Sequence, residues 1–481
     1  MKISIKKFIA GVLISMATAA TTLANEIKLP SMGTDVASRL SNEEEIQLGS
    51  AFMRSVRLQL PISEDPEVLE YIWSLGYDLV SNSDFKSKPF HFFVVNESII
   101  NAFAGPGGYI GVNAGLILAS EDESELAGVI AHEIAHVTQK HLDRAFTTAE
   151  KLTLPTAAAI VAAILLGGKD INLAEAALAA TLAANIQTQL NFTRKHEVEA
   201  DHVGILILTA AKYDPFGMPH FFERLQQQDR LYSDQLPEFL RTHPVTINRI
   251  AESKSRAARY RFTPKAERYE YALIKEKLRV ANANDYVSLI KAYEANQKAG
   301  KNNHKHAQQY GYALALYHAR QLKQAKTVIE TLIKKDRPHI TYTLLLARID
   351  FALEKSPASL SQFADILKLY PRNRAATIYY AESLHEIRKL NEAKQLLLSQ
   401  INNRPTPTVY ELLAKIEGES NRPGSALQML SEFYFMYGQT HTAIEQLNLA
   451  LRQKDIDKIE TARIEQRLEE LKKIAIMERS F

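Results

Sequence analysis

Residues 128–141 read GVIAHEIAHVTQKH, a helix-prone and mostly apolar stretch that holds three histidines and one glutamate. His132 and His136 are four residues apart, so on an α-helix their side chains project about 40° apart on one face. Two imidazoles in this arrangement can bind one metal ion, and Glu133 beside them is placed to take a proton from a water on the metal. On a continuing helix His141 falls on the opposite face, so we do not expect it to be a ligand.

A third ligand is needed to distinguish this site from a chance match. In a chain with 14 histidines, an HExxH motif occurs by accident with a probability of roughly a few per cent. One peptidase class has a further histidine six residues after His136, but Leu142 stands there and no glycine intervenes, which excludes that class. Residues 192–204 read FTRKHEVEADHVG, in which Glu197 and Asp201 share a helix face. Glu197 could complete a His-His-Glu site, and Asp201 could accept a hydrogen bond from a ligand imidazole.

The alternative for residues 192–204 is a charged amphipathic helix without a metal, and only the HExxH stretch favours the site. His196 and His202 point away from the face of Glu197, so we expect them to be solvated. The chain has no cysteine, which excludes disulfides and thiolate ligands. A zinc ion here must therefore be held by His, Asp or Glu.

The first residues have the layout of a secretory signal, with Lys2, Lys6 and Lys7 before an apolar run that ends in small residues at Ala24. These lysines account for the whole formal net charge of +3, so no basic field remains to indicate nucleic acid binding. An uncleaved anchor is the alternative, but the run Phe8–Ala24 is shorter than the roughly 20 apolar residues that a span needs. We predict a cleaved signal peptide over residues 1–24 and a periplasmic protein.

The elements that must position the site can be read from the next part of the chain. Ser41 with Glu44 three residues later predicts a capped helix start. Runs rich in β-forming residues at 90–95 and 109–112 surround the Gly-Pro-Gly-Gly turn at 105–108. The sequence predicts helices around a small sheet whose last strand leads into the histidine helix.

Residues 151–190 are rich in alanine and leucine, with a break at Gly167-Gly168. We interpret them as a buried helical hairpin. A membrane span over residues 152–166 is the alternative, although that run is short and interrupted by Pro155. A peripheral contact with a membrane is the third reading.

Beyond about residue 265 the sequence has a period of about 34 residues. Pro338, Pro371 and Pro405 recur at that spacing, and LKQAKTVIETLI at 322–333 resembles LNEAKQLLLSQI at 390–401. Small residues in paired helices with this period are typical of tetratricopeptide repeats, and we expect four to five helix pairs. Stacked pairs form an α-solenoid with a concave face for partners.

The motifs HEIAH, NAFAGPGGYIGVNAGLI and EVEAD together resemble the HExxH metallopeptidase family that includes the CAAX prenyl proteases and the bacterial heat-shock membrane protease. The resemblance implies a mainly α protein with a zincin-like α+β metallopeptidase domain at 25–262, then an α-solenoid at 263–481. It makes His132, His136 and Glu197 the ligands of one zinc ion per chain, and Glu133 the general base.

The resemblance extends to RTHPVTINRI at 241–250. It suggests that His243 is a fourth ligand or an oxyanion donor, and a loop-holding histidine is the equal alternative. Arg249 could steady the site, although we favour a structural surface pair. Asp201 matches the carboxylate that follows the glutamate ligand in the family. The sheet edge at Asn101–Ala104 could bind an extended peptide as an added strand.

The resemblance also implies a function in the bacterial envelope. It predicts an endopeptidase that helps outer-membrane β-barrels assemble and degrades misassembled ones, with the β-barrel assembly machinery bound by the repeats. The alternative is a repeat-based chaperone or adaptor whose protease domain is latent.

Overall fold

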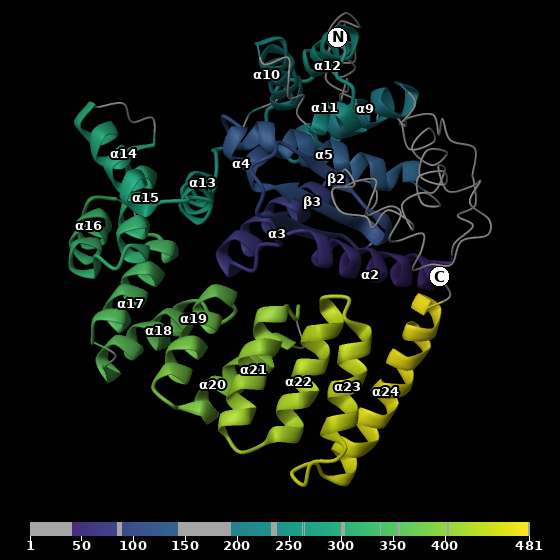
Figure 1. Cartoon of the computed structure of the whole chain (residues 1–481). Coiled ribbons are helices and arrows are strands. Elements are labelled where there is room, and N and C mark those ends of the chain that lie inside the picture. The colour runs from purple at the N-terminus through teal and green to yellow at the C-terminus, as the bar shows by residue number, and fades with distance from the viewer. Residues whose placement is uncertain are drawn as a thin grey trace, which may run out of the picture. The chain divides into compact units, whose positions relative to one another are not determined.

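The computed structural model describes a mainly helical chain with one small sheet (Figure 1). The described residues are 41–83, 89–142, 194–231, 238–261, 263, 265–299, 304–336, 338–354, 356–401 and 404–479. The predicted signal peptide and the hairpin predicted over 151–190, including residues 152–166, lie outside them. Among the described residues, no helix combines the length and apolar character needed to cross a bilayer.

The sheet has the strand order β1-β3-β2. β1 (His91–Val95) pairs in parallel with β3 (Tyr109–Asn113), and β2 (Ala102–Ala104) pairs antiparallel with β3. The two predicted strands are therefore confirmed. The turn between β2 and β3 requires glycine, because Gly107 and Gly108 have φ values of 69° and 75°. A Cβ on Gly108 would also lie 2.2 Å from the carbonyl oxygen of Pro89.

Eight described helices belong to the same part of the chain as this sheet. They are α2 (Asn42–Gln59), α3 (Pro66–Ser81), α4 (Ala114–Ala119), α5 (Glu123–Thr138), α9 (Arg194–Ala210), α10 (Gly217–Leu231), α11 (Glu238–Thr242) and α12 (Ile247–Ala257). The predicted capping box starts α2, where the Glu44 N–H donates to Ser41 Oγ and the Ser41 N–H donates to the Glu44 carboxylate. The prediction that the last strand leads directly into the histidine helix is wrong, since α4 intervenes.

The two faces of the sheet pack against different helices. Phe93, Val95 and Phe103 share a buried cluster with residues of α2. Phe92, Val94 and Val112 alternate with them along the strands and belong to a larger core with α3, α5 and α9. The histidine helix α5 is therefore held between the sheet and later helices, and its apolar residues lie in the centre of this core.

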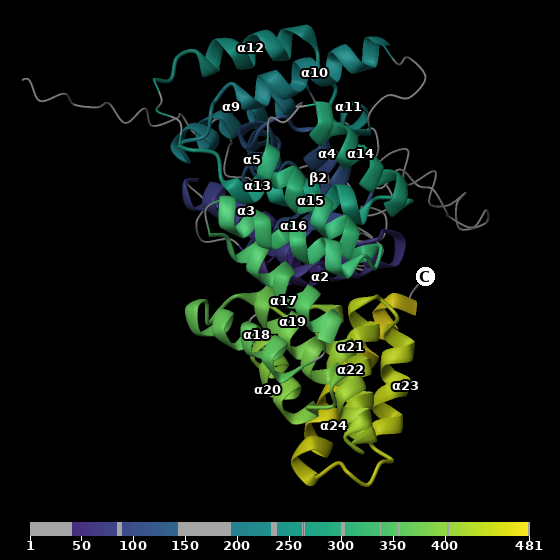
Figure 2. The ribbon, with the colours of Figure 1, turned by 90° about the vertical axis from the view of Figure 1, so that its left-hand side faces the viewer.

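The rest of the chain is an α-solenoid, as predicted. Its helices are α13 (Tyr269–Ala281), α14 (Tyr286–Ala299), α15 (Lys305–His318), α16 (Leu322–Lys335), α17 (Ile340–Glu354), α18 (Pro357–Leu369), α19 (Arg374–Glu386), α20 (Leu390–Ile401), α21 (Pro407–Glu419), α22 (Pro423–Met436), α23 (Thr440–Ala450) and α24 (Lys458–Arg479). Consecutive helices from α15 to α24 stack as hairpins (Figure 1, Figure 2). Fully buried alanines such as Ala313, Ala381 and Ala393 let neighbouring helices approach closely.

Helix α13 belongs to both cores. Tyr271 and Leu278 pack in the core around α5, whereas Leu273 and Val280 pack with the solenoid helices. The boundary predicted at residue 262 precedes this shared helix and remains a prediction.

Helices α2 and α3 contact the solenoid directly. Lys277 of α13 is 4% exposed, pairs with Asp65 at 3.1 Å and with Glu67, and donates to the Tyr379 hydroxyl of α19 at 3.2 Å. The guanidinium of Arg404 lies 4.5 Å from the ring centroid of Trp73 in α3. These contacts attach the solenoid to the part of the chain that contains His132 and His136.

Candidate metal centre

The site is formed where α9 crosses α5. Gly204 of α9 permits this crossing, because a Cβ there would lie 3.1 Å from the backbone nitrogen of His132 and 2.7 Å from the Met218 methyl carbon. The close approach brings Glu197 and Asp201, at the start of α9, beside the two histidines of HEIAH. Two segments that are 60 residues apart in the sequence therefore supply one buried group of side chains.

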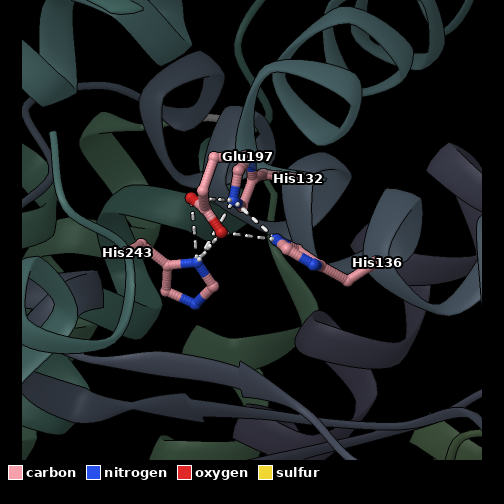
Figure 3. A group of neighbouring side chains, drawn as sticks. All are labelled: His132, His136, Glu197 and His243. Carbon is pink, nitrogen blue, oxygen red and sulfur yellow. Dashed lines mark hydrogen bonds and ion pairs between the residues drawn. The ribbon is translucent and has the colours of Figure 1, made fainter. Parts of the chain in front are cut away.

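Four side chains converge in this group: His132, His136, Glu197 and His243 (Figure 3). Each offers one ligand atom, and these atoms all lie within 4.8 Å of one another. The Nε2 atoms of His132 and His136 are 3.0 Å apart. Glu197 Oε2 lies 3.6 Å from His132 Nε2, and Glu197 Oε1 lies 3.5 Å from His136 Nε2. All four residues are at most 2% exposed.

These separations fit a tetrahedral ion. With metal–ligand bonds of about 2.0–2.2 Å, neighbouring ligand atoms in a tetrahedral zinc site lie about 3.3 Å apart. The distances above are 3.0, 3.5 and 3.6 Å, and the donor set of imidazole and carboxylate suits such an ion.

The charge states of two of these groups are also suitable for a ligand. Burial, together with the charge on His132, holds the pKa of His136 well below its usual value, so the ring is neutral and can coordinate. Burial alone would raise the pKa of Glu197, but the charge on His243 and a hydrogen bond with His132 lower it well below its usual value. Glu197 is therefore an anion in the core.

Asp201 and Arg249 contact the side chains of the cluster from the outside. Asp201 Oδ1 lies 3.0 Å from His132 Nδ1, the ring nitrogen that faces away from the cluster. Arg249 Nη1 lies 2.8 Å from Glu197 Oε2. Arg249 is 2% exposed, which corrects our expectation of a surface pair. It arrives from α12, whose first turn is capped by Thr246 Oγ1 accepting from the Arg249 N–H.

Glu133 lies next to the cluster without joining it. Its carboxylate accepts a hydrogen bond from the Ala104 N–H of β2, and its Oε1 lies 3.6 Å from His243 Nε2. Burial raises the pKa of Glu133, although the charges on His243 and His132 oppose this. A carboxylate with a raised pKa can hold a proton between abstraction and delivery.

His243 enters the cluster from the segment between α11 and α12. Its Nδ1 lies 3.1 Å from Glu197 Oε1 and 3.4 Å from His132 Nε2. The ring stacks on Phe239, with centroids 4.9 Å apart and planes at 30°. The segment RTHPVTINRI thus delivers both His243 and Arg249 to the cluster.

The expected position of His141 is wrong. We expected the helix to continue and to place His141 opposite the ligands, but α5 ends at Thr138 and Lys140 adopts a left-handed φ of 53°. The chain turns back, and His141 Nδ1 lies 2.9 Å from His136 Nδ1. His196 is half-buried rather than solvated, since its ring stacks on His141 with centroids 4.5 Å apart. His202 is also half-buried.

Comparisons with known proteins give consistent results. The sequence pattern of Peptidase family M48 matches residues 67–257. A β-barrel assembly-enhancing protease of Escherichia coli (strain K12) is 32% identical over 447 residues, which cover 93% of this chain and 91% of that protein. The protein of the same name from Yersinia pestis is 30% identical and covers 93% of this chain and 92% of its own length. The mitochondrial metalloendopeptidase OMA1 of Arabidopsis thaliana is 37% identical over 151 residues, 31% of this chain and 28% of that protein.

Proposed function

Because the chain belongs to peptidase family M48 and is a metallopeptidase, we propose that it is a zinc-dependent endopeptidase that holds one zinc ion per chain. His132, His136 and Glu197 are the proposed ligands, and His243 is the proposed fourth ligand of the resting site. The convergence of these four buried side chains carries the proposal. When bound, zinc supplies Lewis-acid polarisation of the scissile carbonyl and lowers the pKa of the attacking water.

Glu133 is the proposed general base. Its buried carboxylate takes the proton of the attacking water and passes it to the leaving amine. The Ala104 N–H fixes the orientation of this carboxylate toward β2. Asp201 holds the tautomer of His132 in which Nε2 faces the ion.

The edge of β2 is the proposed binding rail for an extended substrate. Asn101, Phe103 and Gly105 lie opposite Asn113, Gly111 and Tyr109, and the Gly105 N–H donates to the Tyr109 carbonyl. Since backbone groups alternate in an antiparallel ladder, the peptide groups of Ala102 and Ala104 face away from β3. Within the described residues, β3 is the single strand paired with β2. An added peptide strand would lie beside Glu133 and hydrogen-bond through its backbone, which tolerates many side chains.

The proposed substrates are unfolded or misassembled outer-membrane β-barrel proteins in the periplasm. Relatives that match over more than nine-tenths of the chain carry names that include β-barrel assembly, and the N-terminal layout predicts export. We assign the solenoid to the tetratricopeptide class from its period of about 34 residues, and propose that it binds the assembly machinery.

A second candidate is a chaperone or adaptor in which the peptidase part is latent. The extensive solenoid and its attachment to α2 and α3 favour this candidate, because they provide a rigid surface that needs no catalysis. The complete ligand and base constellation favours hydrolysis. Rescue of a strain that lacks the gene distinguishes the two candidates. If Glu133→Gln rescued the defect as fully as the wild type does, the adaptor function would be established.

Zinc content is the direct test of the proposed site. Purified wild-type protein should contain about one zinc ion per chain, and Glu197→Ala should lose it, because the variant removes the one anionic side chain among the four proposed ligands. A Lys195→Ala variant, at an exposed position of the same helix and outside the cluster, is the matched control for folding. A folded wild type that binds no zinc after loading would overturn the proposal.

A further inference from the structure

The ring nitrogens of His136 differ in what they face. Nε2 faces the cluster, 3.0 Å from His132 Nε2 and 3.5 Å from Glu197 Oε1. Nδ1 faces the other way and lies 2.9 Å from His141 Nδ1. His141 is 1% exposed, so water does not compete for this contact.

The tautomers of both rings follow from this geometry. Two ring nitrogens at 2.9 Å can form a hydrogen bond only if one donates and the other accepts. A ligand His136 must offer its lone pair at Nε2, so its proton lies on Nδ1, which donates to His141 Nδ1. A neutral His141 then carries its own proton on Nε2, which faces Glu199 Oε2 at 3.4 Å. In this arrangement His136 Nδ1 donates, His141 Nδ1 accepts, and His141 Nε2 donates toward Glu199.

Helix α9 fixes His141 from the other side. Glu199 and His196 both belong to α9, and the His196 ring is nearly parallel to that of His141, at 17°. The same helix supplies Glu197, a proposed ligand, and also Asp201, whose Oδ1 lies 3.0 Å from His132 Nδ1. Both histidines of HEIAH therefore have a partner for the nitrogen that faces away from the ion.

We propose that His141 is a positioning residue of the metal site, which accepts the Nδ1–H of His136 and so fixes the ring orientation and tautomer that present Nε2 to the ion. This inference rests on the proposed function, because it assigns a zinc ion to the cluster. Partners of this kind orient ligand imidazoles, and their loss typically weakens metal binding by about 10–100-fold.

Two polar substitutions of His141 test whether its Nδ1 atom matters as a hydrogen-bond acceptor, apart from the rest of the side chain. In His141→Asn, the amide oxygen can occupy the place of Nδ1 and accept from His136. In His141→Gln, the amide extends toward the place of Nε2 and leaves His136 Nδ1 without its acceptor. Zinc dissociation constants are measured by competition with a chromogenic chelator, and thermal unfolding of the zinc-free proteins checks folding. Absorption of the cobalt-substituted proteins reports the ligand geometry.

We expect His141→Asn to bind zinc within about threefold of wild type, and His141→Gln to bind it at least tenfold more weakly, with altered cobalt bands. His202→Gln, at a half-buried histidine of α9 outside the cluster, is the matched control and should bind as wild type. Equal zinc affinity of His141→Gln and wild type overturns the inference, and so does equal weakening by the Asn and Gln variants. A wild type without zinc overturns the proposed function itself, which keeps the two failures distinct.

Discussion

Arg249 binds Asp201 with two parallel hydrogen bonds, from Nε to Oδ2 at 2.9 Å and from Nη2 to Oδ1 at 2.8 Å. Both side chains are buried, and Arg249 Nη1 lies 2.8 Å from Oε2 of Glu197, a proposed metal ligand. The planar guanidinium group of arginine suits this geometry, whereas the ammonium group of lysine does not. One cation thus compensates two carboxylates that are buried in the core.

Substituting Arg249 should therefore weaken the site and the fold together. Arg249→Met leaves two buried carboxylates short of a partner, and we expect a loss of about 3–5 kcal/mol in the unfolding free energy of the zinc-free protein. Zinc affinity should fall at least about tenfold. Chemical denaturation and chelator competition measure the two effects, with Arg259→Met as the surface control. Unchanged stability and affinity would contradict the compensating role of Arg249.

Glu133→Gln should separate metal binding from hydrolysis. The amide keeps the size of the side chain but cannot accept a proton, so peptide cleavage should fall by at least about a hundredfold. Zinc content should stay at the wild-type level, because Glu133 is outside the ligand group. Cleavage of an unfolded protein is followed beside metal analysis of the same samples. Retained cleavage by this variant would remove the role of base from Glu133.

Removal of the metal should cost both activity and stability. A ligand that binds only the folded state adds about 4 kcal/mol when its concentration is 1,000 times its dissociation constant. We expect chelation to abolish cleavage and to lower the melting temperature, and added zinc to restore both. Glu197→Ala serves as the control, since its melting temperature should not respond to the chelator. A chelator-resistant wild-type activity would argue against a metal-dependent reaction.

A proline at Ala102 tests the binding rail. The peptide group of Ala102 faces away from β3, so proline removes an outward N–H while the inner ladder of hydrogen bonds stays intact. Loss of one substrate hydrogen bond is worth about 1 kcal/mol, which predicts a several-fold fall in kcat/KM with unchanged zinc content. Ala102→Gly keeps the N–H, adds no atoms at this buried position and should cleave normally. Normal cleavage by Ala102→Pro would count against the rail.

Lys277 should prove important for the attachment of the solenoid. Lys277→Met removes the cation that faces Asp65 and Glu67, and we expect it to destabilise the chain by about 2–3 kcal/mol. Lys298→Met, at an exposed position of α14, is the control and should change stability by less than about 0.5 kcal/mol. Denaturant titration followed by circular dichroism gives both values. Equal midpoints for the two variants would show that the pairs at Lys277 contribute little.

Features with a local period were readable from the sequence. His132 and His136 share one helix face, and so do Glu197 and Asp201, because an α-helix has 3.6 residues per turn. The repeats appear in the sequence as a period of about 34 residues, the length of one pair of helices. The Ser41 capping box was readable for the same reason, because both of its hydrogen bonds join residues three apart.

Only the tertiary structure decided how the site is supported. The turn at Lys140 returns His141 to His136, and nothing in the apolar pattern of α5 marks where that helix ends. Arg249 is 48 residues from Asp201, so its burial depends on how α12 packs against α9 rather than on its neighbours in the chain. Local hydrogen bonding fixes which residues share a helix face. The packing of separate helices fixes which faces meet, and that packing gives the side chains of the cluster their partners.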